Sequence, residues 1–243
     1  MTRAMQPSSL GLRQVDLLQG LSSERLDAIG RQCAWHPFEA GQRLATREDP
    51  DRDLHFIVAG TVRVTTYSPG GRETSFRELA SGTSFGELAA LDGRPRSADV
   101  VALTSGLIAS MPPAAFRDLL REEWIVNERV LLRLTGLART LVDRVVELST
   151  LNVQQRVCVE LLRLASVNGA GMNKARIEPV PKHTELANRI STYREQVTRE
   201  LSALAKAGVL SREGTALVVR DIARLQCLAK GSVDPGRSAK SGA

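Results

Sequence analysis

Residues 82–97 read Gly-Thr-Ser-Phe-Gly-Glu-Leu-Ala-Ala-Leu-Asp-Gly-Arg-Pro-Arg-Ser. The glycines allow backbone N–H groups to approach a ligand closely, and a short helix can begin at Gly86 with its N-terminus facing an anion. Arg96 supplies a permanent cation that can bind two phosphate oxygens, and Ser97 adds a hydroxyl donor. Glu87 would repel a phosphate, and its natural partner is a sugar hydroxyl. The stretch therefore predicts a nucleotide site for a ligand with a single phosphate.

A simpler interpretation of this stretch is a glycine-rich loop in which Glu87 and Arg96 form a surface ion pair. The whole string is more specific, because it starts Phe-Gly-Glu-Leu and ends Pro-Arg-Ser-Ala. It resembles the phosphate-binding cassette of cyclic-nucleotide-binding domains, as found in the cAMP receptor protein (CRP)/FNR family of bacterial transcription regulators. This resemblance implies a cyclic nucleotide as ligand and the following cassette contacts: Phe85, Gly86, Glu87, Leu88, Arg96 and Ser97.

The composition is that of a globular protein with one large or two modest domains. The chain has 243 residues, of which 42% are hydrophobic and 25% are charged. No apolar run is long enough to span a bilayer, and the N-terminus lacks the apolar core of a signal peptide, so a cytoplasmic location without a membrane partner is expected. No Ser/His/Asp, Cys/His or metal-ligand arrangement is found, so neither an enzyme nor a bound metal is expected.

The three cysteines are dispersed, which predicts neither a disulfide framework nor a metal site. They are Cys33, Cys158 and Cys227. Cys158 falls in an apolar helical pattern and is expected in a core, while the roles of the three thiols stay open.

Positive charge is concentrated in the last third of the chain. Residues 153–243 contain 15 Lys and Arg against 8 Asp and Glu, whereas the remainder contains 18 against 19. This asymmetry suggests a nucleic-acid partner for the C-terminal part, although a solvated basic face would explain the charge equally well.

Short β-strands are predicted between residues 35 and 111. After a helical lead-in, segments rich in β-branched and aromatic residues alternate with turns, which indicates an antiparallel barrel or sandwich. This pattern resembles the β-roll of the family and gives a predicted ligand domain over residues 10–122. The expected strands lie at residues 55–59, 61–67, 73–79, 98–103 and 107–109.

A long helix is predicted over residues 123–150. It would extend about 42 Å, which is longer than a small domain needs for its own core. Apolar residues follow one of its faces, and a coiled-coil contact in a homodimer explains this stripe better than packing across the chain's own two domains. The stripe consists of Val130, Leu134, Leu137, Leu141, Val145 and Leu148.

A helix-turn-helix is predicted over residues 182–207, within a winged-helix domain at 151–230. Thr192 and Glu195 have the spacing of a capping box that opens the second helix, and Gly208 would end it. The pattern Arg-Glu-x-x-x-Arg matches the recognition helix of the family, and two short strands around Gly214 resemble a wing. The residues expected to bind double-stranded operator DNA are Thr192, Tyr193, Arg194, Glu195, Thr198 and Arg199.

Two positions in this motif depart from the family pattern. Ser191 stands where relatives commonly have glycine, so some strain is expected in the turn. Lys182 replaces the usual Ser or Thr cap, which weakens the start of the first helix. Beyond the motif, residues 231–243 are expected to be disordered.

These predictions combine into an α+β protein with an N-terminal cyclic-nucleotide-binding β-roll, a long dimerisation helix and a C-terminal winged helix-turn-helix. The ligand is expected to shift a homodimer towards a state that binds a palindromic operator. The resemblance also implies RNA polymerase as a partner. The alternatives are a ligand-independent regulator or, with less support, a redox or gas sensor and an enzyme-regulating module.

The nucleotide base is less well defined by the sequence than the phosphate and the ribose. In the cAMP receptor protein an adjacent Thr-Ser pair on the long helix contacts the adenine, and this helix is about one turn shorter and lacks the pair. Thr140, Asp143 and Arg144 are the predicted base contacts, because Asp143 can accept from a purine amino group. The expected ligand is cAMP, with cGMP as the alternative.

Overall fold

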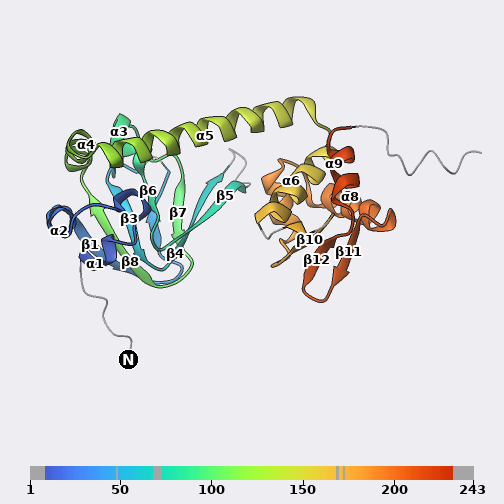
Figure 1. Cartoon of the computed structure of the whole chain (residues 1–243), viewed down its shortest axis with the longest axis horizontal. Coiled ribbons are helices and arrows are strands. Elements are labelled where there is room, and N and C mark those ends of the chain that lie inside the picture. Colours follow the sequence, from blue (N-terminus) through green and yellow to red (C-terminus); the bar gives the residue numbers. More distant parts are fainter. Residues whose placement is uncertain (1–8, 48, 68–72, 168–169, 172, 232–243) are drawn as a thin grey trace, which may run out of the picture. The chain divides into compact units, whose positions relative to one another are not determined.

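The computed structural model describes residues 9–47, 49–67, 73–167, 170–171 and 173–231. The chain forms two compact units, which meet between Ala138 and Arg139. The first is rich in β-structure and the second is mainly helical, so the expected mixed α and β fold is confirmed (Figure 1). The predicted turn at 69–71 and the tail from residue 232 onwards lie outside the described residues.

Two four-stranded antiparallel sheets make up the centre of the first unit. Their strand orders are β1-β8-β3-β6 and β2-β7-β4-β5. Each of the five predicted strands is present, with bounds that differ by at most a few residues. The strands are β1 (Ala34–Phe38), β2 (Arg43–Ala45), β3 (Leu54–Ala59), β4 (Thr61–Tyr67), β5 (Glu73–Ala80), β6 (Ser84–Phe85), β7 (Asp99–Ala102) and β8 (Gly106–Met111).

Helices cover the first of these sheets and close a core around Phe56 and Phe116. Ser22 caps α2 by accepting a hydrogen bond from the backbone of Arg25, and Pro113 begins α4. Both are local signals for a helix start. The helices of this unit are α1 (Ser9–Leu12), α2 (Ser23–Gln32), α3 (Glu87–Asp92), α4 (Pro113–Glu122) and the first half of α5 (Trp124–Thr150), after a 3-10 turn at Asp16–Leu18.

The long helix α5 confirms the prediction for residues 123–150 almost residue for residue. Val126 and Val130 at its start are buried in the core of the first unit. Further along, much of the apolar stripe is exposed in the single chain. The exposed members of the stripe are Leu137, Leu141, Val145 and Leu148.

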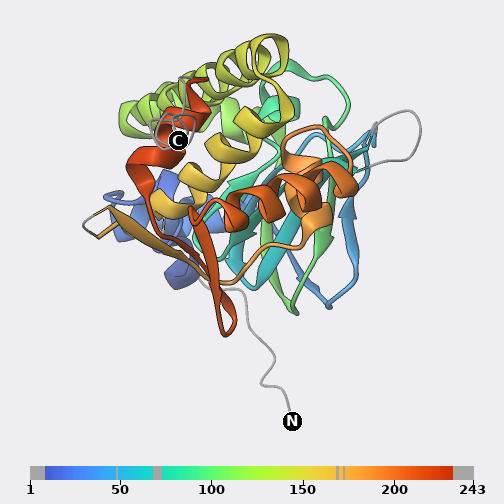
Figure 2. The same cartoon turned by 90° about the vertical axis from the view of Figure 1, so that its right-hand side faces the viewer.

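The second unit contains a helix-turn-helix and a four-stranded sheet with the order β11-β12-β10-β9. Its core gathers apolar residues from every helix, including Leu161, Ile190 and Val197. The β11–β12 hairpin extends away from the helices as the predicted wing (Figure 2). The elements are α6 (Val153–Val167), β9 (Ala170–Gly171), β10 (Lys174–Ile177), α7 (His183–Arg189), α8 (Arg194–Lys206), β11 (Leu210–Glu213), β12 (Ala216–Val219) and α9 (Ile222–Ala229).

The helix-turn-helix confirms one local prediction and corrects another. Ser191 adopts a left-handed backbone with φ of 54°, which is the strain expected where relatives have glycine. The predicted capping box is wrong, because α8 begins at Arg194 with Tyr193 as its N-cap. Thr192 is buried instead, and its hydroxyl donates to Gln196. The N-terminus of the first helix is better capped than expected, since Glu185 accepts a hydrogen bond from the backbone N–H of Lys182 at 3.1 Å.

Candidate functional site

The cassette begins where strand β6 turns into helix α3. Gly86 has φ of 92° and is closely surrounded: a Cβ atom there would lie 2.1 Å from Arg96 Nη1 and 2.7 Å from the carbonyl oxygen of Asp53. A side chain is excluded both by the left-handed backbone and by the lack of space. The glycine is therefore required for the close approach of the Arg96 guanidinium to the backbone.

A cavity of about 130 Å³ opens beside this turn. All six cassette residues predicted from the sequence contribute to its lining, together with side chains from β4, β5 and α5 that the sequence did not indicate. The complete lining consists of Val64, Arg77, Leu79, Ser84, Phe85, Gly86, Glu87, Leu88, Ala89, Arg96, Ser97 and Arg133. The fold thus brings the predicted phosphate and ribose contacts together, and their binding role stays a prediction.

Arg96 is buried, with 4% of its side chain exposed, and it is surrounded by acceptors. Its guanidinium forms an ion pair with Asp51 and donates to the Asp53 carbonyl oxygen at 2.7 Å. His55 lies between these groups, with its Nε2 atom 2.7 Å from Arg96 Nη2 and 3.0 Å from Asp51 Oδ2. The other ring nitrogen of His55 is 2.8 Å from the hydroxyl oxygen of Ser110. The arginine is thus neutralised by a carboxylate of its own chain.

The electrostatics of this cluster favour an ionised Asp51. Burial raises the pKa of its carboxyl. Hydrogen bonds with His55, with Arg96 and with the backbone of Asp53 lower the pKa by more than burial raises it. The net pKa of Asp51 lies well below its ordinary value. The negative charge that balances Arg96 is therefore present throughout the neutral range.

Sequence reasoning missed Asp51 and His55. They lie about 40 residues before Arg96 in the chain, and neither belongs to the cassette. The antiparallel pairing of β3 with β6, in which His55 is opposite Phe85, brings them to the site. The proximity of Asp51 and His55 to Arg96 therefore follows from the strand register and not from a local sequence motif.

Arg133 joins α5 to the cavity. Its guanidinium donates to the Ser84 hydroxyl at 2.7 Å and to the Ser84 carbonyl oxygen at 3.1 Å. Both bonds hold the strand that leads into the cassette. A helix residue thereby contacts the segment that would surround a bound phosphate.

The predicted base contacts Thr140, Asp143 and Arg144 belong to the second unit and are not among the lining residues of the cavity. Arg144 is instead 3.4 Å from Glu147 Oε2 and 3.4 Å from Glu160 Oε2. Their part in recognising a base stays a prediction.

Glu160 of α6 is the centre of a second buried charge network, which the sequence analysis did not find. Only 4% of its side chain is exposed, and three arginines from three helices surround it. Arg189, at the end of α7, lies 3.3 Å from Oε1. Arg144 of α5 and Arg163 of α6 each lie 3.4 Å from Oε2, and Arg163 also pairs with Glu147. The network fastens the end of α5 and the first helix of the helix-turn-helix to α6.

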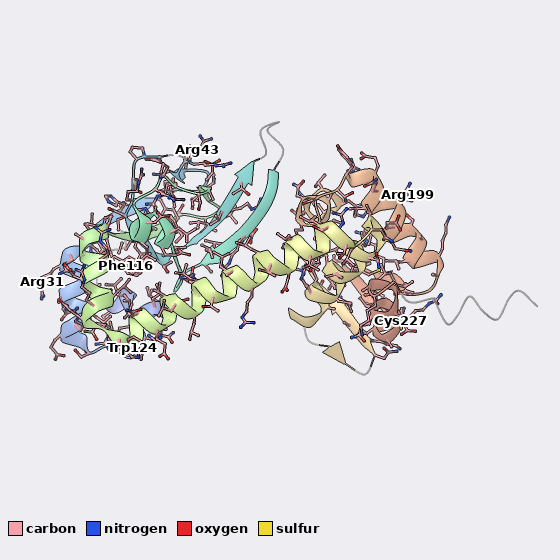
Figure 3. The ribbon with its side chains drawn as sticks, turned by 90° about the horizontal axis from the view of Figure 1, so that it is seen from above. Arg31, Arg43, Phe116, Trp124, Arg199 and Cys227 are labelled. Atoms are coloured by element: carbon pink, nitrogen blue, oxygen red, sulfur yellow. The ribbon has the colours of Figure 1, made fainter. Side chains whose placement is uncertain are left out.

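The recognition helix α8 presents most of the predicted DNA contacts to solvent. Tyr193, Arg194, Glu195, Thr198 and Arg199 are exposed on its N-terminal half. Arg199 lies on the outer surface of the second unit, with 71% of its side chain exposed (Figure 3). These five residues form the candidate nucleic-acid interface.

Two of the predicted DNA contacts have neighbours that bear on this role. Thr198 Oγ1 lies 2.8 Å from His183 Nδ1, which ties the two helices of the motif together. The predicted DNA contact at Thr192 is wrong, because its side chain is buried and donates a hydrogen bond to Gln196.

Two of the cysteines are buried, one in each unit. Burial raises the pKa of the Cys33 thiol and of the Cys158 thiol to about 12. The expected core position of Cys158 is confirmed. Within the described part of the chain, no group of His, Cys, Asp and Glu is placed to hold a metal ion. None of the described helices is long and apolar enough to cross a membrane.

Two family models match separate parts of the chain. Residues 35–123 match the cyclic nucleotide-binding domain, and residues 155–228 match the Crp-like helix-turn-helix domain. The first match contains every residue that lines the cavity except Arg133, and the second contains α7, α8 and the wing.

Several known proteins are similar to the chain along most of its length. A Mycobacterium tuberculosis protein described as a CRP-like cAMP-activated global transcriptional regulator is 26% identical over 215 residues, which cover 88% of this chain and 96% of the relative. The cyclic AMP receptor protein of Thermus thermophilus is 29% identical over 218 residues, with coverages of 88% and 97%. The crystal structure of the Thermus thermophilus catabolite activator protein matches with a TM-score of 0.52 at 28% identity, over 88% of this chain and 98% of that one.

Proposed function

Because the chain belongs to the CRP/FNR family of transcription regulators, we propose that it is a homodimer controlled by a cyclic nucleotide. In this proposal the ligand occupies the cassette cavity and shifts the dimer to a state that binds a palindromic operator. The observation that carries it is the buried Arg96, which lies against Gly86 at the cavity and is balanced by a carboxylate that a phosphate can replace.

The lining of the cavity supports a cyclic monophosphate as the ligand. Arg96 and Ser97 supply donors for one phosphate, and Glu87 is an acceptor for the ribose hydroxyl. Because the relatives are described as a cAMP-activated regulator and a cyclic AMP receptor protein, cAMP is the first ligand to test, with cGMP as the alternative. No resident metal is part of the proposal.

The long helix supports the homodimer. Apolar side chains of α5 are exposed in the single chain well beyond the core of the first unit, and an exposed apolar stripe of this length is typical of an interaction surface. A second copy of the same helix would cover it. The stripe then serves both to join the protomers and to set the spacing of the two recognition helices, which must be about 34 Å for successive major grooves.

DNA binding is proposed to use the exposed N-terminal half of α8. Arg194 and Arg199 have the donors to read guanine, and Glu195 can accept from cytosine. The family resemblance adds a cytoplasmic location and RNA polymerase as a partner to the proposal.

The test is a comparison of Arg96→Ala with Arg94→Ala. Arg94 lies in the same loop with 84% of its side chain exposed, so the second variant removes an equal charge away from the cavity. Operator DNA selected in vitro is titrated by fluorescence anisotropy with and without cAMP or cGMP. We expect nucleotide-stimulated binding in the Arg94→Ala variant and none in the Arg96→Ala variant, while light scattering finds dimers in both. Unchanged stimulation in Arg96→Ala would refute the assignment of the cavity.

A ligand-independent regulator is the second candidate function. It is favoured by the ion pair between Arg96 and Asp51, which already completes the site without a phosphate. In that case the protein binds its operator fully without nucleotide, and calorimetry detects no binding of cAMP or cGMP.

A further inference from the structure

The cavity has two chemically different ends. Gly86, Glu87, Arg96 and Ser97 form the end suited to phosphate and ribose. Part of the remaining wall comes from the hairpin of β4 and β5, through Val64, Arg77 and Leu79. The base of a nucleotide held by its phosphate and ribose in the first end would therefore meet the hairpin.

Strand register explains how Arg77 reaches this wall. Arg77 is paired with Val64 across the β4–β5 ladder, and Leu79 follows two residues later on the same face of the strand. Leu79 is buried, so this face is the inner one. Arg77 thus interrupts an apolar wall with a cation. Glu78 points to the opposite face, where its carboxylate pairs with Arg63 at 2.7 Å.

Arg77 differs from the other two arginines of the cavity in its partners. Arg96 is balanced by Asp51, and Arg133 donates to Ser84. Within the described residues, no ion pair or hydrogen bond is found for the Arg77 guanidinium, and its side chain is exposed. Its donors are therefore available to a ligand that enters the cavity.

We propose that Arg77 reads the base of the bound nucleotide and makes the cavity selective for guanine over adenine. An arginine has five N–H donors and no acceptor. Guanine presents the adjacent acceptors O6 and N7, which match the guanidinium in a bidentate arrangement, whereas adenine presents a donor at N6 beside the acceptor N7. Val64, opposite Arg77 in the hairpin, and Leu79, two residues after it, supply apolar contacts for the base.

This inference rests on the proposed function, because it assumes that the cavity holds a cyclic nucleotide. The proposed preference for cGMP is the opposite of the preference for cAMP that the descriptions of the relatives suggest. A bidentate match distinguishes the right base from the wrong one by about tenfold or more. We therefore expect cGMP to bind at least about tenfold more tightly than cAMP.

The experiment measures the ratio of the two dissociation constants by calorimetry on the full-length protein. Three substitutions are compared with the parent chain: Arg77→Ala, Arg77→Gln and the control Arg94→Ala. The Ala variant should bind both nucleotides with a ratio close to one. A glutamine amide carries a donor and an acceptor that match N7 and N6 of adenine, so Arg77→Gln should move the preference towards cAMP. The control should keep the ratio of the parent chain.

Each outcome of these titrations supports or overturns a definite statement. A parent chain that prefers cAMP, or a ratio that neither Arg77 variant changes, overturns the role of Arg77 while the cavity remains a nucleotide site. Binding of neither nucleotide to the parent chain overturns the proposed function as well. A cyclic dinucleotide that binds more tightly than cGMP, with the gain lost in Arg77→Ala, would show that Arg77 binds a second phosphate and not a base. Circular dichroism of every variant verifies that the fold is retained.

Discussion

Among the described Arg, Lys, Asp and Glu residues, one side chain is buried in each unit: a cation in the first unit and an anion in the second. In the first unit the buried charge is the Arg96 cation, which a single carboxylate balances at the edge of a cavity. In the second unit it is the Glu160 anion, which three arginines from three helices surround. An arginine that one carboxylate balances beside a cavity can exchange that carboxylate for an anionic ligand. A glutamate with three partners from three elements is suited to hold those elements together.

The largest effect is expected from Glu160→Ala, which would break the second network. Removing one partner of a buried ion pair leaves the other charges uncompensated and commonly costs about 3–5 kcal/mol. We expect the second unit to lose about 3 kcal/mol of stability and the first to lose little. Alkylation of Cys158 and Cys33 in increasing urea, followed by peptide mass spectrometry, measures the opening of each unit separately.

The control for this experiment is Glu195→Ala, which removes an exposed carboxylate from the same unit. Its Cys158 should become reactive at the same urea concentration as in the parent chain. If Glu160→Ala also leaves Cys158 protected at that concentration, the network does not stabilise the unit and the contrast between the two buried charges disappears.

A smaller effect is expected from Asp51→Asn, which removes the negative charge that balances Arg96 within the chain. The phosphate of the ligand would no longer compete with a carboxylate, so nucleotide affinity should increase by about fivefold, the equivalent of one charge-assisted hydrogen bond of about 1 kcal/mol. Calorimetry measures this change, with the exposed Asp92→Asn as the control. Weaker binding in Asp51→Asn would mean that Asp51 positions Arg96 for the ligand and does not compete with it.

The smallest effect is a dependence of stability on acid pH in the first unit. The pKa of Asp51 is lower in the folded chain than its unfolded value of about 3.9. Its stabilising contribution is therefore complete above that value and is lost as the pH falls towards the folded pKa. Because about a third of the Asp51 side chain is exposed, we expect this contribution to be at most about 1 kcal/mol.

Urea titrations between pH 5 and pH 2 test this dependence, with the fluorescence of Trp35 and Trp124, which both belong to the first unit, as the readout. The difference between the parent chain and Asp51→Asn should shrink as the pH falls. A difference that stays constant to pH 2 would show that the charge of Asp51 does not contribute to the stability of the unit.

Local patterns in the sequence predicted most of the architecture. The strands, the long helix and the two helices of the DNA-binding motif follow from periodicity and turn residues, which act over a few neighbours. That the six cassette residues lie together at one cavity could be predicted, because they are within sixteen residues of one another in the chain. The left-handed Ser191 could also be anticipated, since the tight turn needs that backbone whatever residue occupies it.

The parts that could not be predicted depend on contacts between distant segments. The pairing of Asp51 and His55 with Arg96 follows from the register of β3 against β6. The position of Arg77 on the cavity wall follows from its pairing with Val64, and the Glu160 network requires three helices to meet. The predicted role of Thr192 failed for a related reason: burial against the core decided its partner, and the helix begins one residue later than predicted.

The division of the chain within α5 has a consequence for how such regulators can be rearranged. Residues near the start of the helix, such as Val126, complete the core of one unit, while Arg144 and Glu147 near its end complete the charge network of the other. A gene fusion at residue 151 would remove Arg144 and Glu147 from the network around Glu160, and one at residue 123 would remove apolar residues from the core of the first unit. The two halves are therefore modules that share a part, and an exchange of either half between regulators must carry its own portion of the helix.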